Sequence, residues 1–333
     1  MEDYQKVYDL QRQHMNDDLH KADRKPVHES WFREDTADFW RHKRMYDTIK
    51  PIASFYHDKK WLSIGDGRYG LDSYRLNKIF NIDVFPTDIS KNMLEKAREM
   101  GIVKDYGVEN AEQLSFSDQS HDVVFCKESF HHFPRPIIAL YEMIRVSREA
   151  VVLIEPSEGY TLNRPKTICK QLVKLLLNCL PRQNNNLDQR YHFFSDPPHS
   201  FEECGNYVYF LSRREMLKIA YGLNLKGTAW KGFNDYYIKG CEFEKADSTS
   251  EVFTKMKTEI KKRDRNCNLL PLFYDWGLVT VVLFKQEVHP DLKLNMEAVG
   301  YQFSNIFHNP YVDKNSAAEH YIPSVGGQSL DLE

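Results

Sequence analysis

The sequence lacks features that mark several large classes of protein. Lys and Arg number 45 against 48 Asp and Glu, a net charge of −3, so no global positive field would attract nucleic acid or an anionic membrane. The longest apolar stretch, 172–180, is interrupted by Lys174 and Asn178 and is far shorter than the roughly 20 residues that a bilayer requires. We therefore expect no nucleic-acid partner and no membrane span.

Cysteine is also scarce. The six cysteines form no C-x-x-C pair, and Cys126 lies within an apolar strand pattern, so we predict neither a disulfide framework nor a metal site. The first residues, Met1 to Gln5, lack the basic start and the apolar stretch of a secretory signal. Together these features predict a cytoplasmic protein with reduced thiols.

What is present is a globular composition with a repeated strand and helix pattern. The chain has 333 residues, of which 41% are hydrophobic, enough for an α/β core with additions. Short apolar runs that predict strands occur at 61–64, 82–87, 102–108, 122–126, 150–154, 225–230 and 278–284. Because helical patterns separate the first five, we predict a doubly wound, mostly parallel, seven-stranded Rossmann-like sheet, with the last two strands pairing as an antiparallel edge.

Composition changes along the chain predict its organisation. The expected regions are an N-terminal helical cap at 1–58, a first half of the core at 59–156, an inserted lid at 157–211, a second part of the core at 212–286 and a peripheral C-terminal arm at 287–333. The alternation stops after Pro156 and resumes near Ser212, and an insertion is the economical interpretation of that gap.

A glycine-rich turn follows the first predicted strand. Gly65, Gly67 and Gly70 lie between this strand and a predicted helix, where a turn without side chains lets a ligand approach the backbone closely. Asp88 ends the second strand, so its carboxylate is expected beside the turn and could accept hydrogen bonds from both ribose hydroxyls. An adenosine-containing cofactor follows, either a nicotinamide dinucleotide or S-adenosylmethionine, because both fit this pattern.

Four stretches in order favour the second cofactor. They are 62–67 (LSIGDG), 87–94 (TDISKNML), 109–118 (ENAEQLSFSD) and 120–133 (SHDVVFCKESFHHF). With them, the chain resembles the class I S-adenosylmethionine-dependent methyltransferases over residues 60–156, and within that class the group that includes the ubiquinone and menaquinone biosynthesis methyltransferases. The resemblance implies methyl transfer, S-adenosylmethionine as the cofactor, and a site at the carboxyl ends of the strands.

The resemblance also implies the residues that hold the cofactor. Gly65, Asp66 and Gly67 would pass under its methionine portion, Asp88 would hold the ribose, and the adenine would lie among side chains of the second and third units. The implied cofactor-binding set is Gly65, Asp66, Gly67, Gly70, Asp88, Ile89, Met93, Asn110, Ala111 and Lys127. Asn110 stands where the family usually has Asp. Ser63 stands where many members have an acid that orients the methionyl ammonium group, and this departure predicts weaker cofactor binding.

Two histidines after the fourth strand are candidates for proton transfer. His131 and His132 lie where ligands gather in such sheets, and imidazole titrates in the range that suits a general base. Glu128, three or four residues earlier, could orient one of them. The alternative is that these histidines cap a helix or pack under the lid. A metal site from these three residues would lack a further ligand, so none is predicted.

The expected acceptor is an oxygen or nitrogen atom of a small molecule. Aromatic residues with hydrogen-bonding tips gather at 190–194 and 206–210, a composition that suits a sugar, a nucleotide-linked sugar or a secondary metabolite, and it is equally compatible with ordinary packing. The pair Arg213 and Arg214 could meet a phosphate or could lie on a solvated helix face. Two alternatives stay open: an NAD(P)-dependent oxidoreductase, because 65–70 also spells G-x-G-x-x-G, and a non-catalytic module that binds S-adenosylmethionine.

Overall fold

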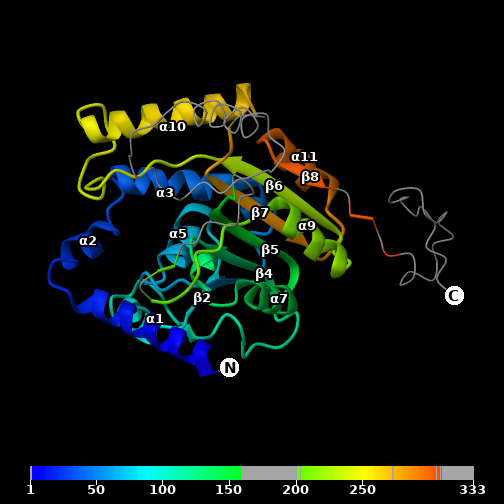
Figure 1. The fold of residues 1–333 in the computed structure, drawn as a ribbon, viewed down its shortest axis with the longest axis horizontal. Helices are drawn as coiled ribbons and strands as arrows, with labels where there is room; N and C mark the ends of the chain where they lie inside the picture. The colour runs from blue at the N-terminus through cyan, green and yellow to red at the C-terminus, as the bar shows by residue number, and fades with distance from the viewer. Residues whose placement is uncertain are drawn as a thin grey trace, which may run out of the picture.

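The computed structural model of the chain describes residues 2–158, 201–202, 204–271, 274–304, 306–307 and 309. Its strands are β1 (Trp61–Ile64), β2 (Val84–Asp88), β3 (Gly107–Val108), β4 (His121–Lys127), β5 (Ser147–Pro156), β6 (Gly227–Phe233), β7 (Leu278–Phe284) and β8 (Gln302–Ser304). These strands form one sheet in the order β3-β2-β1-β4-β5-β7-β6-β8, with helices on both sides of it (Figure 1).

The sheet is parallel in its first half and antiparallel in its second. Strands β3, β2, β1, β4 and β5 pair in parallel, whereas β7 is antiparallel to both β5 and β6. The predicted fold class is confirmed, including the antiparallel pairing of the last two predicted strands. The prediction of seven strands was one short, because Gln302–Ser304, expected in the peripheral arm, pairs with β6 as the edge strand β8. The third predicted strand, 102–108, is reduced to Gly107–Val108.

Eleven helical segments cover the sheet in the described part of the chain. They are α1 (Glu2–His20), α2 (Lys25–Ser30), α3 (Ala37–Thr48), α4 (Lys50–Phe55), α5 (Leu71–Phe80), α6 (Lys91–Glu99), the 3-10 turn η1 (Phe130–His132), α7 (Pro136–Val146), α9 (Arg213–Gly222), α10 (Glu251–Leu269) and α11 (Pro290–Ala298).

The apolar runs are explained by burial on both sheet faces. In β5, Val152 and Ile154 pack with residues of α3 and α4 in one core, while Val151 and Leu153 pack with α7 and α9 in another. Alternate residues of a strand point to opposite faces, so a central strand between two helical layers must be apolar throughout. The central strands therefore read as continuous apolar runs.

The N-terminal helices occupy two different positions, because α3 and α4 pack in a core against the sheet and none of the described residues of α1 belongs to that core. Helix α1 packs on α6, and Figure 1 shows α1 and α10 at opposite ends of the molecule. Most of the insertion expected at 157–211, including 190–194, lies outside the described residues. Within the described residues, no helix is both long enough and apolar enough to span a bilayer.

Candidate active site

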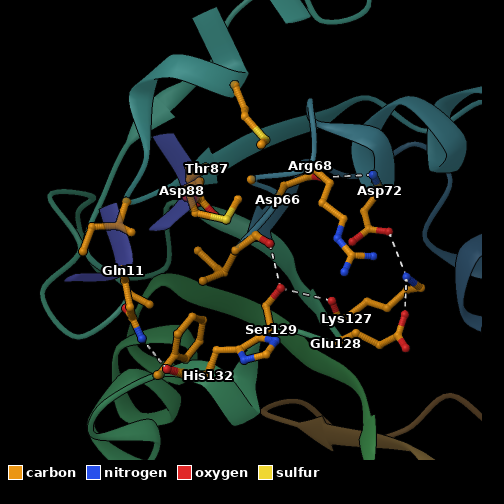
Figure 2. Close-up of a pocket in the computed structure, with 18 of the residues that line it drawn as sticks. Gln11, Asp66, Arg68, Asp72, Thr87, Asp88, Lys127, Glu128, Ser129 and His132 are labelled. Atoms are coloured by element: carbon orange, nitrogen blue, oxygen red, sulfur yellow. Dashed lines mark hydrogen bonds and ion pairs between the residues drawn. The ribbon is translucent and has the colours of Figure 1, made fainter. Parts of the chain in front are cut away.

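A cavity of about 600 Å³ lies where β1, β2 and β4 end. Gly65 follows β1, Asp88 ends β2 and Lys127 ends β4, and all three line the cavity (Figure 2). Helices α1 and α3 contribute Gln11 and His42 to the lining of the same cavity. Ligands of open α/β sheets bind outside the carboxyl ends of the strands, so this cavity has the position expected of the active site.

The glycine turn approaches other residues more closely than a side chain would allow. Gly65 has φ +74°, and a Cβ there would stand 2.5 Å from the Cβ of Ser129, whose hydroxyl donates a hydrogen bond of 2.7 Å to the Gly65 carbonyl. A Cβ on Gly67 would stand 2.6 Å from Oδ2 of Asp88. Gly70, with φ +61°, precedes α5 and contacts Val103 rather than the cavity.

Asp66 has a structural function in this turn. Its carboxylate is 2% exposed and accepts hydrogen bonds from the backbone N–H of Asp72 (3.0 Å) and from both the N–H (2.9 Å) and the hydroxyl (2.6 Å) of Ser73. Burial and the neighbouring charge of Asp72 raise the pKa of Asp66 to about 7. Asp66 lines the cavity and at the same time caps the first turn of α5.

The predicted ribose and adenine residues lie together on the β2 side. Asp88 accepts a hydrogen bond of 2.7 Å from the N–H of Ser90, and burial raises its pKa to about 6. Ile89, Met93 and Ala111 line the same part of the cavity. Asn110 uses its side-chain oxygen to accept the N–H of Glu112 at 3.0 Å, which leaves the amide N–H groups as donors.

A charged cluster forms the wall after β4. Nζ of Lys127 lies 3.4 Å from Oδ1 of Asp72 and 3.0 Å from Oε2 of Glu128, and Nδ1 of His42 lies 3.3 Å from the same Glu128 oxygen. Burial opposes ionisation of Glu128, but Lys127, His42 and Arg41 hold its pKa well below the usual range. Burial and the charge of Lys127 lower the pKa of His42, and the neighbouring Glu128 opposes this shift.

The two candidate histidines have different environments. His132 lines the cavity, and its Nδ1 lies 2.6 Å from Oε2 of Glu202. His131 does not line the cavity, because its Nδ1 is bonded at 2.6 Å to Glu155, a fully buried carboxylate. The expectation that Glu128 orients one of them is wrong, since each histidine pairs with another carboxylate and Glu128 pairs with His42 and Lys127.

Several residues proposed for acceptor binding lie elsewhere. Arg213 donates to Gln302 and Ser304 at the edge of the sheet, away from the cavity, and Tyr209 packs its ring on Phe130. The segment 190–194 lies outside the described residues. Among the described residues, no group of three or more His, Cys, Asp or Glu side chains is arranged to hold a metal ion.

The sequence reasoning missed the contribution of the N-terminal helices. Tyr8, Gln11, Met15 and Asp18 of α1 line the cavity, and Gln11 donates a hydrogen bond of 2.5 Å to the His132 carbonyl. Their spacing of three and four residues marks one face of a helix, which could have indicated a shared surface. Nothing in that spacing indicates what the face covers.

Comparison with known proteins identifies the class. Residues 62–154 match a family profile described as a methyltransferase domain. The chain therefore contains a methyltransferase domain of the S-adenosylmethionine-dependent class. Its cofactor is S-adenosylmethionine, which excludes the nicotinamide alternative.

Solved structures of other methyltransferases are similar to this methyltransferase at low identity. An S-adenosylmethionine-dependent methyltransferase from Archaeoglobus fulgidus is 15% identical, with 74% of this chain and 94% of that chain covered and a TM-score of 0.43. The phosphoethanolamine N-methyltransferase 2 of Haemonchus contortus, in complex with phosphomonomethylethanolamine and S-adenosylhomocysteine, is 13% identical, with 74% and 53% covered and a TM-score of 0.41. The search of curated proteins returned no match.

Proposed function

We propose that this methyltransferase transfers the methyl group to an oxygen or nitrogen atom of a small molecule, such as a sugar, a nucleotide-linked sugar or a secondary metabolite. The observation that carries the proposal is one cavity lined both by the Gly65 turn with Asp88 and by the His132–Glu202 pair. Its volume of about 600 Å³ lies within the range of roughly 300 to 1,000 Å³ that is typical of small-molecule sites.

The residues at the adenosine end fit the cofactor. Asp88 offers a carboxylate for two ribose hydroxyls, and Gly67 leaves it the space to lie against the turn. Ile89, Met93 and Ala111 supply an apolar lining for the adenine, and the amide of Asn110 supplies donors to its edge. We assign these residues, with Gly65 and Lys127, to cofactor binding.

We assign proton transfer to His132. When bound, the cofactor supplies a methyl group on an electrophilic sulfonium, so the protein must mainly align the acceptor and exclude water. Nδ1 of His132 is held by Glu202, and this pairing leaves Nε2 to accept a proton from the acceptor. Glu202 then stabilises the imidazolium: its pKa, which burial alone would raise, is lowered to about 2 by His132. His131 serves the fold, through its bond to buried Glu155.

The test combines cofactor binding with methyl transfer. Calorimetry with S-adenosylhomocysteine measures binding, and tritiated S-adenosylmethionine with methyl glycosides, UDP-sugars, catechols and primary amines measures transfer. We expect label in at least one of these acceptors. Failure of the wild type to bind S-adenosylhomocysteine at millimolar concentration would remove the proposal, and transfer only to nucleic acid or protein would remove the small-molecule acceptor.

The His132→Gln variant tests the base. We expect kcat for a hydroxyl acceptor to fall by about 10²- to 10⁴-fold, with S-adenosylhomocysteine affinity changed by less than about twofold. His57→Gln is the control, because His57 is exposed near the end of α4 and outside the cavity. An unchanged kcat in His132→Gln would show that His132 is not the base, while the reaction class would stand.

We also propose a cytoplasmic location. Cys126, Cys204 and Cys241 are free thiols, and two of them are buried, as expected of a protein that folds in a reducing compartment. Subcellular fractionation with an antibody to this chain tests the location.

A further inference from the structure

Ser63 cannot supply the carboxylate that the family pattern has at its position. It is 1% exposed, does not line the cavity, and its backbone carbonyl accepts a hydrogen bond of 2.7 Å from the hydroxyl of Thr87. The methionyl end of the cofactor carries an ammonium and a carboxylate. Both charges therefore need partners from other positions in this chain.

Two carboxylates line the cavity beyond the Gly65 turn. Asp72 lies in the first turn of α5, and Glu128 follows β4 with φ +49°, a left-handed conformation that is costly for a residue with a side chain. The single ammonium of Lys127 lies between them, at 3.4 Å from Asp72 and 3.0 Å from Glu128. The contacts of each carboxylate within the described residues fall on one of its oxygens: Tyr46 and Lys127 contact Oδ1 of Asp72, and Lys127 and His42 contact Oε2 of Glu128. The second oxygen of each carboxylate is therefore left as an acceptor, which suits an ammonium group.

A cation faces the same space from the glycine turn. The guanidinium carbon of Arg68 lies 5.3 Å from the ring centre of Trp31, and among the described residues no carboxylate forms an ion pair with it. Figure 2 shows the Arg68 side chain extending from the turn toward Asp72 and Lys127. A guanidinium binds a carboxylate through two parallel hydrogen bonds, and its stacking on Trp31 limits its freedom before a ligand arrives.

We infer that these groups form the binding site for the amino-acid end of S-adenosylmethionine, with Asp72 and Glu128 binding its ammonium and Arg68 binding its carboxylate. The Gly65 turn separates this cluster from Asp88, so the two sets can bind the two ends of one elongated molecule. The inference rests on the proposed cofactor site and extends it to residues outside the family pattern. Asp72 and Glu128 thereby replace the acid that is absent at Ser63.

Two pairs of ligands measure the contribution of the amino-acid end to binding: S-adenosylhomocysteine with 5′-methylthioadenosine, and S-adenosylmethionine with its decarboxylated form. 5′-Methylthioadenosine shares the adenosine and the thioether of S-adenosylhomocysteine but lacks the amino-acid tail. Decarboxylated S-adenosylmethionine keeps the ammonium and lacks the carboxylate. Calorimetry measures each dissociation constant, and thermal unfolding verifies that every variant is folded.

The Arg68→Met variant keeps an apolar contact for Trp31 and removes the charge. We expect about 10- to 50-fold weaker binding of S-adenosylhomocysteine and of S-adenosylmethionine, and less than about twofold change for 5′-methylthioadenosine and for the decarboxylated compound. Arg98→Met is the matched control, because Arg98 lies over the ring of Tyr106, also at about 5 Å, on α6 outside the cavity.

The acidic partners are tested by Glu128→Gln and, as a second variant should the first not fold, Asp72→Asn. Both variants should bind S-adenosylhomocysteine and decarboxylated S-adenosylmethionine about 5- to 20-fold more weakly than the wild type does, with the affinity for 5′-methylthioadenosine unchanged. Glu95→Gln, at an exposed pair with Lys91, is the control.

The outcomes separate the two proposals. A wild type that binds neither S-adenosylhomocysteine nor 5′-methylthioadenosine contradicts the proposed function. Two results would overturn the assignment of Arg68, Asp72 and Glu128 and leave the proposed function standing. One is a wild type that binds S-adenosylhomocysteine and 5′-methylthioadenosine with equal affinity. The other is a set of variants that change the affinity for both ligands by the same factor, or for neither.

Discussion

The two ends of the cavity are built in different ways. At the end that we assign to the adenosine, called the adenosine end below, the backbone of the glycine turn and small or apolar side chains determine the shape, and Asp88 is the charged group against the turn. At the other end, Asp72, Lys127 and Glu128 form a charged cluster that Arg68 faces. If the two assignments are correct, we expect the adenosine end to select its ligand by shape and the charged end to select by charge.

This difference predicts different tolerance to substitution. A backbone turn with contacts of 2.5 to 2.6 Å to a hypothetical Cβ has no room to adjust, because it is packed against β2 and the segment after β4. In a charged cluster, a carboxylate at one position can serve in place of a carboxylate at another, which is what we propose for Asp72 and Glu128 in a chain that has Ser63. Substitutions at the adenosine end should therefore be the more damaging.

The largest effect is expected from Gly67→Ala. The new Cβ would displace the Asp88 carboxylate, so we expect at least about 30-fold weaker binding of both S-adenosylhomocysteine and 5′-methylthioadenosine, measured by calorimetry. Gly222→Ala is the control, because a Cβ at that helix end meets no atom within 4 Å. Loss confined to S-adenosylhomocysteine would contradict the division of the cavity into two ends.

The second largest effect is expected in the pH dependence of ligand binding at the adenosine end. Because the pKa of Asp88 is raised to about 6, the carboxylate is protonated below that pH, and affinity for 5′-methylthioadenosine should fall by up to about tenfold per pH unit. Binding by Asp88→Asn should be weak and lack this step.

The free energy of unfolding, measured at each pH, shows whether unfolding contributes to the loss of binding. The folded state binds the Asp88 proton more readily than the unfolded state does, so between about pH 6 and 4 this group stabilises the fold as the pH falls. Loss of affinity over that interval therefore does not come from unfolding caused by Asp88. A flat binding profile in the wild type would contradict the assignment of Asp88 to the ribose.

A smaller effect is expected from Tyr8→Phe in α1. The Tyr8 hydroxyl donates to buried Glu112 and accepts a hydrogen bond of 3.1 Å from Arg135, which ties the helix to the adenosine end. Loss of these bonds should speed release of S-adenosylhomocysteine by about 3- to 10-fold in stopped-flow measurements. Tyr4→Phe, on the same helix and exposed, should release at the wild-type rate.

The smallest effect is expected from Asn110→Asp, which restores the residue usual in the family. The side-chain oxygen that accepts the Glu112 N–H is retained, so S-adenosylhomocysteine affinity should change by less than about threefold. A larger loss would mean that the Asn110 amide donates a hydrogen bond that the carboxylate cannot replace. Gln113→Glu, an exposed neighbour, controls for added charge.

Much of the parallel half of the sheet could be predicted because its signals are local. The runs at 61–64, 122–126 and 150–154 became β1, β4 and β5, since burial on both faces requires continuous apolar residues. The extra strand Gln302–Ser304 could not be predicted, because three residues beside a polar arm carry no periodicity and form a strand only through pairing with β6.

The candidate site divides in the same way. Gly65, Gly67 and Asp88 were predicted from the turn and the strand end, and they line the cavity. The functions of His131 and His132 could not be separated in the sequence, because their partners, Glu155 and Glu202, are 24 and 70 residues away.

The sequence by itself therefore determined the class of the enzyme, the central order of strand and helix, and the adenosine end of the site, because each depends on residues within one short segment. Tertiary structure alone decided which histidine faces the cavity, which carboxylate holds it, and how α1, α3 and the glycine turn enclose the other end. Those contacts join residues that are distant in the chain, and local pattern contains no information about which distant side chains the folded backbone brings together.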